Sequence, residues 1–328
     1  MGSKRRISAV YGPVPSWRLG PSLGIDVVPP PKTCTFDCVY CQLGRTLRKA
    51  SGFVQAQVTK QQVLRDVKTA LDLLDPASVD YVTFSGSGEP TLNPELGAII
   101  ESLRNLTDKP IAVLTNSSLV GKEKVRRSLA MADLVVAKLD APDQRLFEAV
   151  NRPARGILQG RIVEGLVKLR GEMTGELALQ MMFFESENGG LTNVGDEAVE
   201  AMMRQAERIE PDEIQINTPT RPPSEKFVLA LEPDKLEAIA KKFKLSVTNA
   251  KIVSRYEERA NRSPKRLGHR ETEAEILSLI KRRPCRVEDI ASSLNLPMNV
   301  IVSSLRELEH RGAAVKVRHR HEDYFRSR

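Results

Sequence analysis

The sequence predicts an α/β protein, built as a partial, open barrel of six βα units and followed by a small helical domain. Three observations lead to this fold class. Short β-branched runs alternate with helical patterns from residue 24 to about residue 245, and each parallel crossover needs a connection of helix length. Six units are fewer than the eight of a closed barrel. After residue 270 the alternation is replaced by three helical patterns and a period-two run. A flat, doubly wound sheet is the second choice.

The six predicted strands are rich in Val, Ile, Leu and Phe. They cover residues 24–28, 79–85, 110–116, 134–140, 176–184 and 213–217. Helices fit between them. The first helix has Thr59 as its N-cap, with Gln62 three residues later. Another, beginning near Asn193, spaces five apolar side chains for one helical face: Val199, Met202, Met203, Ala206 and Ile209.

The chain divides into an N-terminal extension (1–23), the partial barrel (24–250), a linker (251–270) and a C-terminal domain (271–328). The linker is predicted because RSPKRLGHR, residues 262–270, is polar and basic and contains Pro and Gly. The C-terminal domain has three helical patterns and then a hairpin with alternation from Val315 to His319. This order resembles a winged helix, a variant of the helix-turn-helix.

Composition indicates a soluble protein of a reducing, cytoplasmic compartment, with no membrane partner. No apolar run approaches the roughly 20 residues that cross a bilayer, and the basic start has no apolar segment behind it. The formal charge is +8. Residues 254–328 hold 17 Lys and Arg against 11 Asp and Glu, a balance of +6. Such a surface either attracts polyanions such as nucleic acid or is a solvated face.

Three of the four cysteines lie in CTFDCVYC, residues 34–41, on the loop after the first predicted strand. A structural zinc site usually needs a second pair of ligands. None is present near the motif, because Cys285 and all four histidines lie beyond residue 268. Zinc is therefore a minor alternative. Three thiolates on a four-iron cluster leave one iron free to hold a further ligand.

The spacing of Cys34, Cys38 and Cys41, with the aromatic Tyr40 before the last cysteine, resembles the signature of the radical S-adenosylmethionine (radical SAM) superfamily. The resemblance implies a 4Fe-4S cluster whose open iron binds S-adenosyl-L-methionine. It also implies reductive cleavage of that cofactor and hydrogen abstraction by a 5′-deoxyadenosyl radical, with Tyr40 beside the cofactor. The protein would act as an oxidoreductase or transferase.

The ends of the next three strands supply further candidates for cofactor binding. Gly88 and Glu89 in FSGSGEPTL match the Gly-Gly-Glu region of the superfamily, which lies against the methionine amino group. Asn116 and Ser117 in TNSS stand where relatives place a polar residue near the ribose, although they also suit a turn that caps a helix.

Lys138 and Asp140 alternate with apolar residues and therefore share one face. A lysine there should meet a carboxylate, either that of the cofactor or Asp140. Arg152, Arg155 and Arg221 are candidates for a phosphate or carboxylate of the substrate. The sequence assigns no catalytic acid or base, and the barrel has no histidine.

The runs VYGPVPSWRLGPSLGIDVVPPPKTCTFDCVYCQLGRT, SGEPTL and LDAPD resemble the branch of the wyosine-forming tRNA enzymes, over roughly residues 10–245. Those enzymes hold a second cluster, and this chain lacks the cysteines for one. The first functional hypothesis is therefore a radical enzyme that modifies RNA, such as tRNA, or another large substrate. The second is a radical enzyme acting on a protein or small molecule, with the winged helix binding a partner. A cluster-containing regulator that binds DNA is a third. An external low-potential electron donor of the flavodoxin or ferredoxin type is implied in the enzymatic cases.

Overall fold

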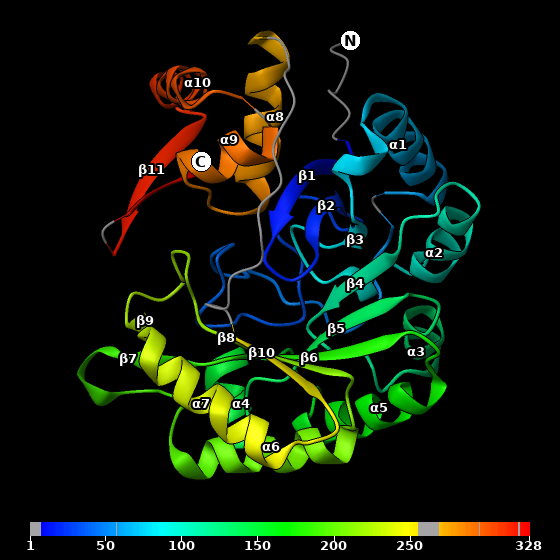
Figure 1. Cartoon of the computed structure of the whole chain (residues 1–328), viewed down its shortest axis with the longest axis vertical. Coiled ribbons are helices and arrows are strands. Elements are labelled where there is room, and N and C mark those ends of the chain that lie inside the picture. Colours follow the sequence, from blue (N-terminus) through cyan, green and yellow to red (C-terminus); the bar gives the residue numbers. More distant parts are fainter. Residues whose placement is uncertain (1–7, 57, 255–268, 295, 321) are drawn as a thin grey trace.

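A computed structural model describes residues 8–56, 58–254, 269–294, 296–320 and 322–328. A larger α/β body carries the sheet, and a smaller C-terminal domain of three helices and a hairpin packs on one side of it (Figure 1). None of the helices in the described part of the chain combines the length and the apolar content that crossing a membrane requires.

The α/β body is built on an eight-stranded, mostly parallel sheet. Its strand order is β1-β2-β3-β4-β5-β6-β8-β10, and only the pair β1 and β2 is antiparallel. The strands are β1 (Val10–Ser16), β2 (Gly20–Ile25), β3 (Tyr81–Phe84), β4 (Ile111–Thr115), β5 (Leu134–Lys138), β6 (Glu176–Met182), β8 (Glu213–Asn217) and β10 (Lys251–Ser254). A separate pair joins β7 (Phe184–Ser186) to β9 (Val228–Ala230). The predicted α/β class with a parallel sheet is confirmed.

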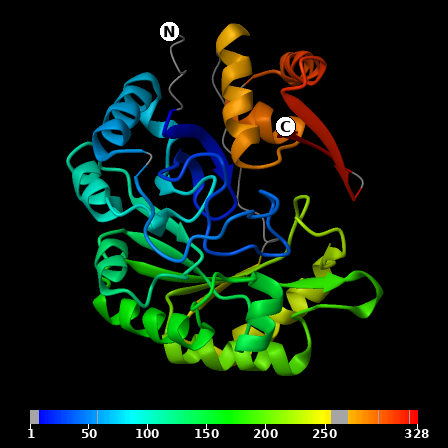
Figure 2. The ribbon, with the colours of Figure 1, turned by 180° about the vertical axis from the view of Figure 1, so that it is seen from behind.

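The helices of this body lie on the outside of the curved sheet (Figures 1 and 2). They are α1 (Lys60–Leu73), α2 (Leu96–Arg104), α3 (Glu123–Leu129), α4 (Gln144–Asn151), α5 (Gln159–Glu172), α6 (Asp196–Ile209) and α7 (Pro233–Ser246). Thr59 caps α1, since its side chain accepts the Gln62 N–H. In α6 the five residues predicted for one face are all buried. Because that face is apolar and the other charged, the helix can only pack one way.

Two sequence-based boundaries differ from the structure. The segment predicted as an N-terminal extension contains β1 and the start of β2, and β2 ends at Ile25 rather than at residue 28. Prolines and glycines in YGPVPS and GPS hide the strand pattern, and the edge position of β1 tolerates them. At the other end, β10 occupies residues predicted as linker and pairs with β8. The rest of that linker, residues 255–268, lies outside the described residues.

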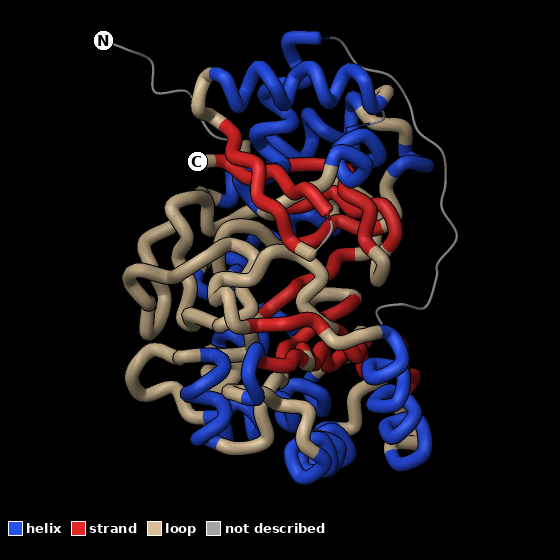
Figure 3. Tube along the Cα trace, turned by 90° about the vertical axis from the view of Figure 1, so that its left-hand side faces the viewer, coloured by secondary structure: helices blue, strands red, loops and turns tan. Residues whose placement is uncertain are grey.

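The C-terminal domain contains α8 (His269–Arg282), α9 (Val287–Leu294), α10 (Met298–His310) and the antiparallel strands β11 (Ala314–His319) and β12 (Glu322–Ser327). Figure 3 shows helices at both ends of the molecule, and the labels of Figure 1 place α8, α9 and α10 at one end and α5 and α6 at the other. Its core includes Ile276, Leu279, Ile290 and Leu305 and, from β1 of the α/β body, Tyr11. The three helices and the hairpin appear in the predicted order, while the winged-helix assignment stays a prediction.

Candidate metal and cofactor site

The cysteine motif lies on the long loop after β2, at the carboxyl edge of the parallel sheet, where βα proteins gather their chemistry. Figure 2 shows this blue loop between the C-terminal helices and the lower strands. Cys38 is buried, Cys34 and Cys41 are partly buried, and all three are free thiols. Backbone bonds fix the loop: Cys41 N–H donates to Cys38 O at 3.1 Å, and Ala50 N–H donates to Cys34 O at 3.0 Å.

Each of the three sulfur atoms accepts a hydrogen bond from a different side chain. Cys34 Sγ lies 3.3 Å from Asn116 Nδ2. Cys38 Sγ lies 3.4 Å from Asn151 Nδ2, and Cys41 Sγ lies 3.2 Å from Lys32 Nζ. N–H donors to cysteine sulfur are one of the levers by which proteins tune an iron–sulfur cluster.

The sequence did not predict two of these donors. Asn151 ends α4, over a hundred residues from the motif, and Lys32 follows a proline run. Only the position of Lys32, two residues before Cys34, offered a local signal.

Burial disfavours the charged thiolate form of Cys34 and of Cys38. Burial, reinforced by the Glu89 carboxylate, raises the pKa of Cys34 to about 11. Burial and the nearby Cys41 raise the pKa of Cys38 to about 12. A metal that binds these sulfurs must therefore displace protons, as thiolate-binding metals do.

Among the described residues, no three His, Cys, Asp or Glu side chains gather closely enough to hold one metal ion. A zinc ion needs all of its donors about 2.0–2.3 Å from one point. A four-iron cluster places each thiolate on a different iron, so its ligands stand farther apart. The donor set, three thiols with a hydrogen-bond donor on each sulfur, fits the cluster.

A buried network around Asp140 links the motif to the barrel strands. Asp140 is 4% exposed and accepts a short hydrogen bond from Tyr40 Oη. It also accepts one from Asn151 Nδ2 at 3.0 Å and one from Met182 N at 2.9 Å. Lys138 Nζ lies 3.2 Å from Asp140 Oδ1 and over the Tyr40 ring. The predicted pairing of Lys138 with a carboxylate is therefore present. Burial and the Asp140 charge raise the pKa of Tyr40, which stays a hydrogen-bond donor.

Glu89, the predicted contact for the methionine amino group, is buried and fully engaged. Its Oε1 accepts hydrogen bonds from Thr91 N–H and from the Thr91 and Thr115 hydroxyls, and its Oε2 accepts Asn116 N–H at 2.7 Å. Burial raises its pKa, while these donors oppose the rise. Glu89 therefore connects the loop after β3 to the end of β4 through hydrogen bonds.

The other predicted cofactor residues lie at this same edge. Gly88 packs on the motif loop, since a Cβ built there would lie 1.9 Å from Thr33 O. At the end of β4, Asn116 reaches the cysteine loop, and Ser117 adopts a left-handed φ of 67°, with a buried hydroxyl that has no hydrogen-bond partner among the residues that the structure describes. Such strain is found at ligand sites. Cys34, Gly88, Glu89 and Asn116 thus come together from loops far apart in sequence, while Lys138 contacts Asp140 and the Tyr40 ring.

Two of the three arginines proposed to bind an anion have protein partners in the structure. Arg152 pairs with Glu225 and lies 4.0 Å from Asp37. Arg221 donates from Nε to Pro284 O of the C-terminal domain at 3.1 Å. Arg155 is exposed. Arg152 and Arg221 are thus engaged in holding the loops around the motif.

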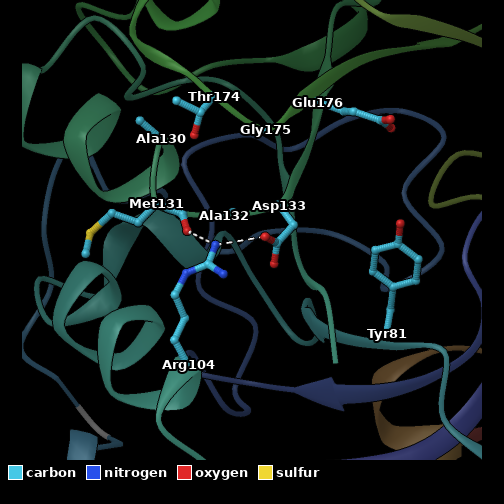
Figure 4. A pocket seen from close by; sticks show the side chains of 9 residues that line it. All are labelled: Tyr81, Arg104, Ala130, Met131, Ala132, Asp133, Thr174, Gly175 and Glu176. Carbon is cyan, nitrogen blue, oxygen red and sulfur yellow. Dashed lines mark hydrogen bonds and ion pairs between the residues drawn. The ribbon is translucent and has the colours of Figure 1, made fainter. Parts of the chain in front are cut away.

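A hollow of about 660 Å³ lies at the other edge of the sheet (Figure 4). Tyr81, Asp133 and Glu176, at the amino ends of β3, β5 and β6, line it, and Arg104 Nη2 donates to Asp133 at 2.9 Å. Since the cysteines lie at the carboxyl edge, this hollow is separate from their site.

Comparison with known proteins gives one family match, to the model described as the radical SAM superfamily, over residues 28–206. A UPF0026 protein of Methanocaldococcus jannaschii is 32% identical over 316 residues, covering 95% of this chain and 93% of the relative. A protein of Brachyspira hyodysenteriae named GTPase Obg is 33% identical over 310 residues, covering 94% of this chain, which spans only 44% of that relative. A crystal structure of a radical SAM methyltransferase from Sphaerobacter thermophilus superposes with a TM-score of 0.50 at 15% identity, covering 72% of this chain and 67% of the other. At that identity the last likeness concerns the fold alone.

Proposed function

The chain belongs to the radical SAM superfamily, whose cofactors are a 4Fe-4S cluster and S-adenosylmethionine, and we propose that it is an enzyme that modifies a polyanionic substrate, RNA in particular. The proposed enzymatic activity is supported by the three cysteines at the carboxyl edge of the sheet, each of which has its own hydrogen-bond donor.

Cys34, Cys38 and Cys41 would hold the cluster, and Gly88, Asn116 and Lys138 would contact the S-adenosylmethionine bound to it. When bound, the two cofactors supply one-electron cleavage of the sulfonium and hydrogen abstraction from the substrate. The protein's own contribution is placement. Lys32, Asn116 and Asn151 orient the sulfurs, and the buried Asp140 network holds the motif loop against β5 and β6. An external low-potential donor of the flavodoxin or ferredoxin type would supply the electron, since Cys285 is the one cysteine outside the motif.

Support for a polyanionic substrate comes from the C-terminal hairpin. Lys316, Arg318, Arg320, Arg326 and Arg328 on and beside its strands are exposed. The hairpin also contacts the loop after β8, where Tyr324 Oη donates to Thr220 O at 2.8 Å. Ser224 of the same loop donates to the Cys38 and Val39 carbonyls, each at 3.0 Å. A phosphate backbone bound along the hairpin would therefore lie next to the motif loop.

The proposed enzymatic activity is tested by replacing single cysteines. We expect anaerobically reconstituted protein to hold about four irons per chain and to form 5′-deoxyadenosine from S-adenosylmethionine. Cys38→Ala should lose both, whereas Cys285→Ala, in the core of the C-terminal domain, should keep both. Formation of 5′-deoxyadenosine by Cys38→Ala would contradict the assignment.

The proposal of a polyanionic substrate is tested by measuring how salt changes the affinity for unfractionated tRNA and for duplex DNA. Arg326→Gln with Arg328→Gln should lower the slope of log affinity against log salt by roughly 1.5, because each lost phosphate contact removes about 0.7–0.9. The control is Arg204→Gln with Arg208→Gln on the exposed face of α6. Equal slopes for all three proteins would favour a protein or small molecule as the substrate.

A further inference from the structure

Arg282, the last residue of α8, crosses from the C-terminal domain into the α/β body. Its side chain is 4% exposed, and its Nε lies 3.3 Å from Oδ2 of Asp26, which is 2% exposed. Asp26 follows β2 directly and begins the loop that leads to the cysteines. Two charges are thus paired out of water across the boundary between the domains, 256 residues apart in the sequence.

Asp26 in turn holds the loop between β3 and Glu89. Its Oδ2 accepts hydrogen bonds from Ser87 N–H at 3.1 Å and from the Ser87 hydroxyl at 2.8 Å. The neighbouring Gly86 has a φ of +151°, and a Cβ built there would lie 2.3 Å from Asp26 Cγ. The carboxylate therefore packs directly against the backbone of residues 85–89, which we call the glycine loop.

The glycine loop touches the cysteine motif. Gly88 forms an isolated parallel bridge with Thr33, the residue before Cys34. Glu89 N–H donates to Thr33 O at 3.2 Å, and Glu89 also accepts the N–H of Asn116, whose side chain donates to Cys34 Sγ. A continuous set of contacts therefore runs from Arg282 through Asp26 and the glycine loop to Cys34.

The other two nitrogen atoms of the Arg282 guanidinium also donate hydrogen bonds. Nη1 donates to the Ser278 carbonyl and hydroxyl at 3.0 and 2.7 Å, and Nη2 donates to Ser8 O at 3.0 Å. The guanidinium lies 4.5 Å from the centroid of the Tyr11 ring. Tyr11 Oη is itself 2.7 Å from the Ser85 hydroxyl, at the start of the glycine loop. Only a planar group with several fixed donors can make these contacts at once.

We propose that Arg282 is a positioning residue of the cofactor site: through Asp26 and Tyr11 it fixes the glycine loop in the conformation that receives S-adenosylmethionine. The C-terminal domain is then a part of the cofactor site and not a detachable module for docking. This inference rests on the proposed enzymatic function for the identity of the ligand. The fixing of the loop can be measured without any cofactor.

The first measurement is amide hydrogen–deuterium exchange on the cluster-free full chain. In Arg282→Met the Ser87 amide and its neighbours in residues 84–92 should exchange at least tenfold faster, while residues 176–182 of β6 keep their protection. Arg286→Met is the matched control, because Arg286 bonds Asp289 and Glu322 within its own domain. It should leave the glycine loop unchanged. Equal protection of residues 84–92 in Arg282→Met and wild type would overturn the proposal.

The second measurement is the dissociation constant for S-adenosylmethionine in reconstituted protein of equal iron content. Arg282→Met should bind at least tenfold more weakly, and Arg282→Lys should lie between Met and wild type. If Arg282→Met does not fold, the double variant Asp26→Asn with Arg282→Met removes both buried charges and serves in its place. Unchanged affinity at full iron content would leave Arg282 a purely structural residue and sink the inference. Absence of binding by the wild type would instead refute the proposed function.

Discussion

At the scale of single residues, the site is defined by what surrounds the sulfurs. Lys32 is the one charged donor of the three, with its Nζ 3.2 Å from Cys41 Sγ. An added electron makes a cluster more negative, so a nearby cation stabilises the reduced form.

We therefore predict that Lys32→Met lowers the cluster's reduction potential by on the order of 50 mV, the value of a roughly tenfold change for one electron. A redox titration followed by electron paramagnetic resonance (EPR) measures it. Lys49→Met is the control, since Lys49 Nζ binds the Arg152 and Pro153 carbonyls and contacts no sulfur. A potential that stays the same in Lys32→Met would refute this role.

A second residue-scale prediction concerns the electron donor. Leu47 is 94% exposed and lies on the motif loop beside the exposed cations Arg48 and Lys49. An apolar tip among cations suits an acidic carrier protein. Leu47→Ala with Arg48→Glu should lower the rate at least fivefold with reduced flavodoxin and leave the rate with dithionite unchanged. Leu73→Ala, equally apolar and 82% exposed on α1, is the control. An equal loss of rate with reduced flavodoxin and with dithionite would show that this surface does not bind the electron donor.

At the scale of elements, the close approach of the glycine loop to the motif loop needs a residue without a side chain. Gly88→Ala would place Cβ 1.9 Å from Thr33 O, a backbone atom that cannot rotate away. We expect a loss of about 1–3 kcal/mol in the free energy of unfolding and a loss of S-adenosylmethionine binding.

Gly171→Ala in α5 is the matched control, because its added Cβ would meet no described atom within 4 Å other than those of its chain neighbours and its own helix backbone. It should gain roughly 0.5–1 kcal/mol, as alanine does over glycine in a helix. Urea unfolding curves compare the two variants, and equal stabilities would contradict the close packing described here.

The elements also show what could be predicted from the sequence. The parallel strands and the face of α6 follow from local periodicity, and the cysteine motif is read within eight residues. β1 was hidden because its prolines break the pattern, although its edge position tolerates them. Asn151 and Arg282 could not be found, since each acts on a partner more than a hundred positions away. Such contacts are set by tertiary packing and leave no local signal.

At the scale of the whole molecule, the two domains share a core. Tyr11 of β1 packs among the apolar side chains of α8, α9 and α10, and the buried pair of Asp26 and Arg282 crosses the same boundary. Removing either partner of such a pair is strongly destabilising.

We predict that the two domains unfold together in a single cooperative transition. The one tryptophan, Trp17, lies in the turn between β1 and β2. The unfolding curve from its fluorescence should have the same midpoint as the curve from helix content, measured by circular dichroism. A separate early transition in helix content alone would show that the C-terminal domain unfolds independently.

We infer that three cysteines of this chain hold a cluster with one iron open to S-adenosylmethionine. The most direct test is the EPR spectrum of the reduced, reconstituted protein with and without that cofactor. Binding at the open iron should shift the g values in the wild type, at about four irons per chain. A spectrum that is identical with and without S-adenosylmethionine, or a preparation that takes up zinc in place of iron, would refute the open-iron cluster.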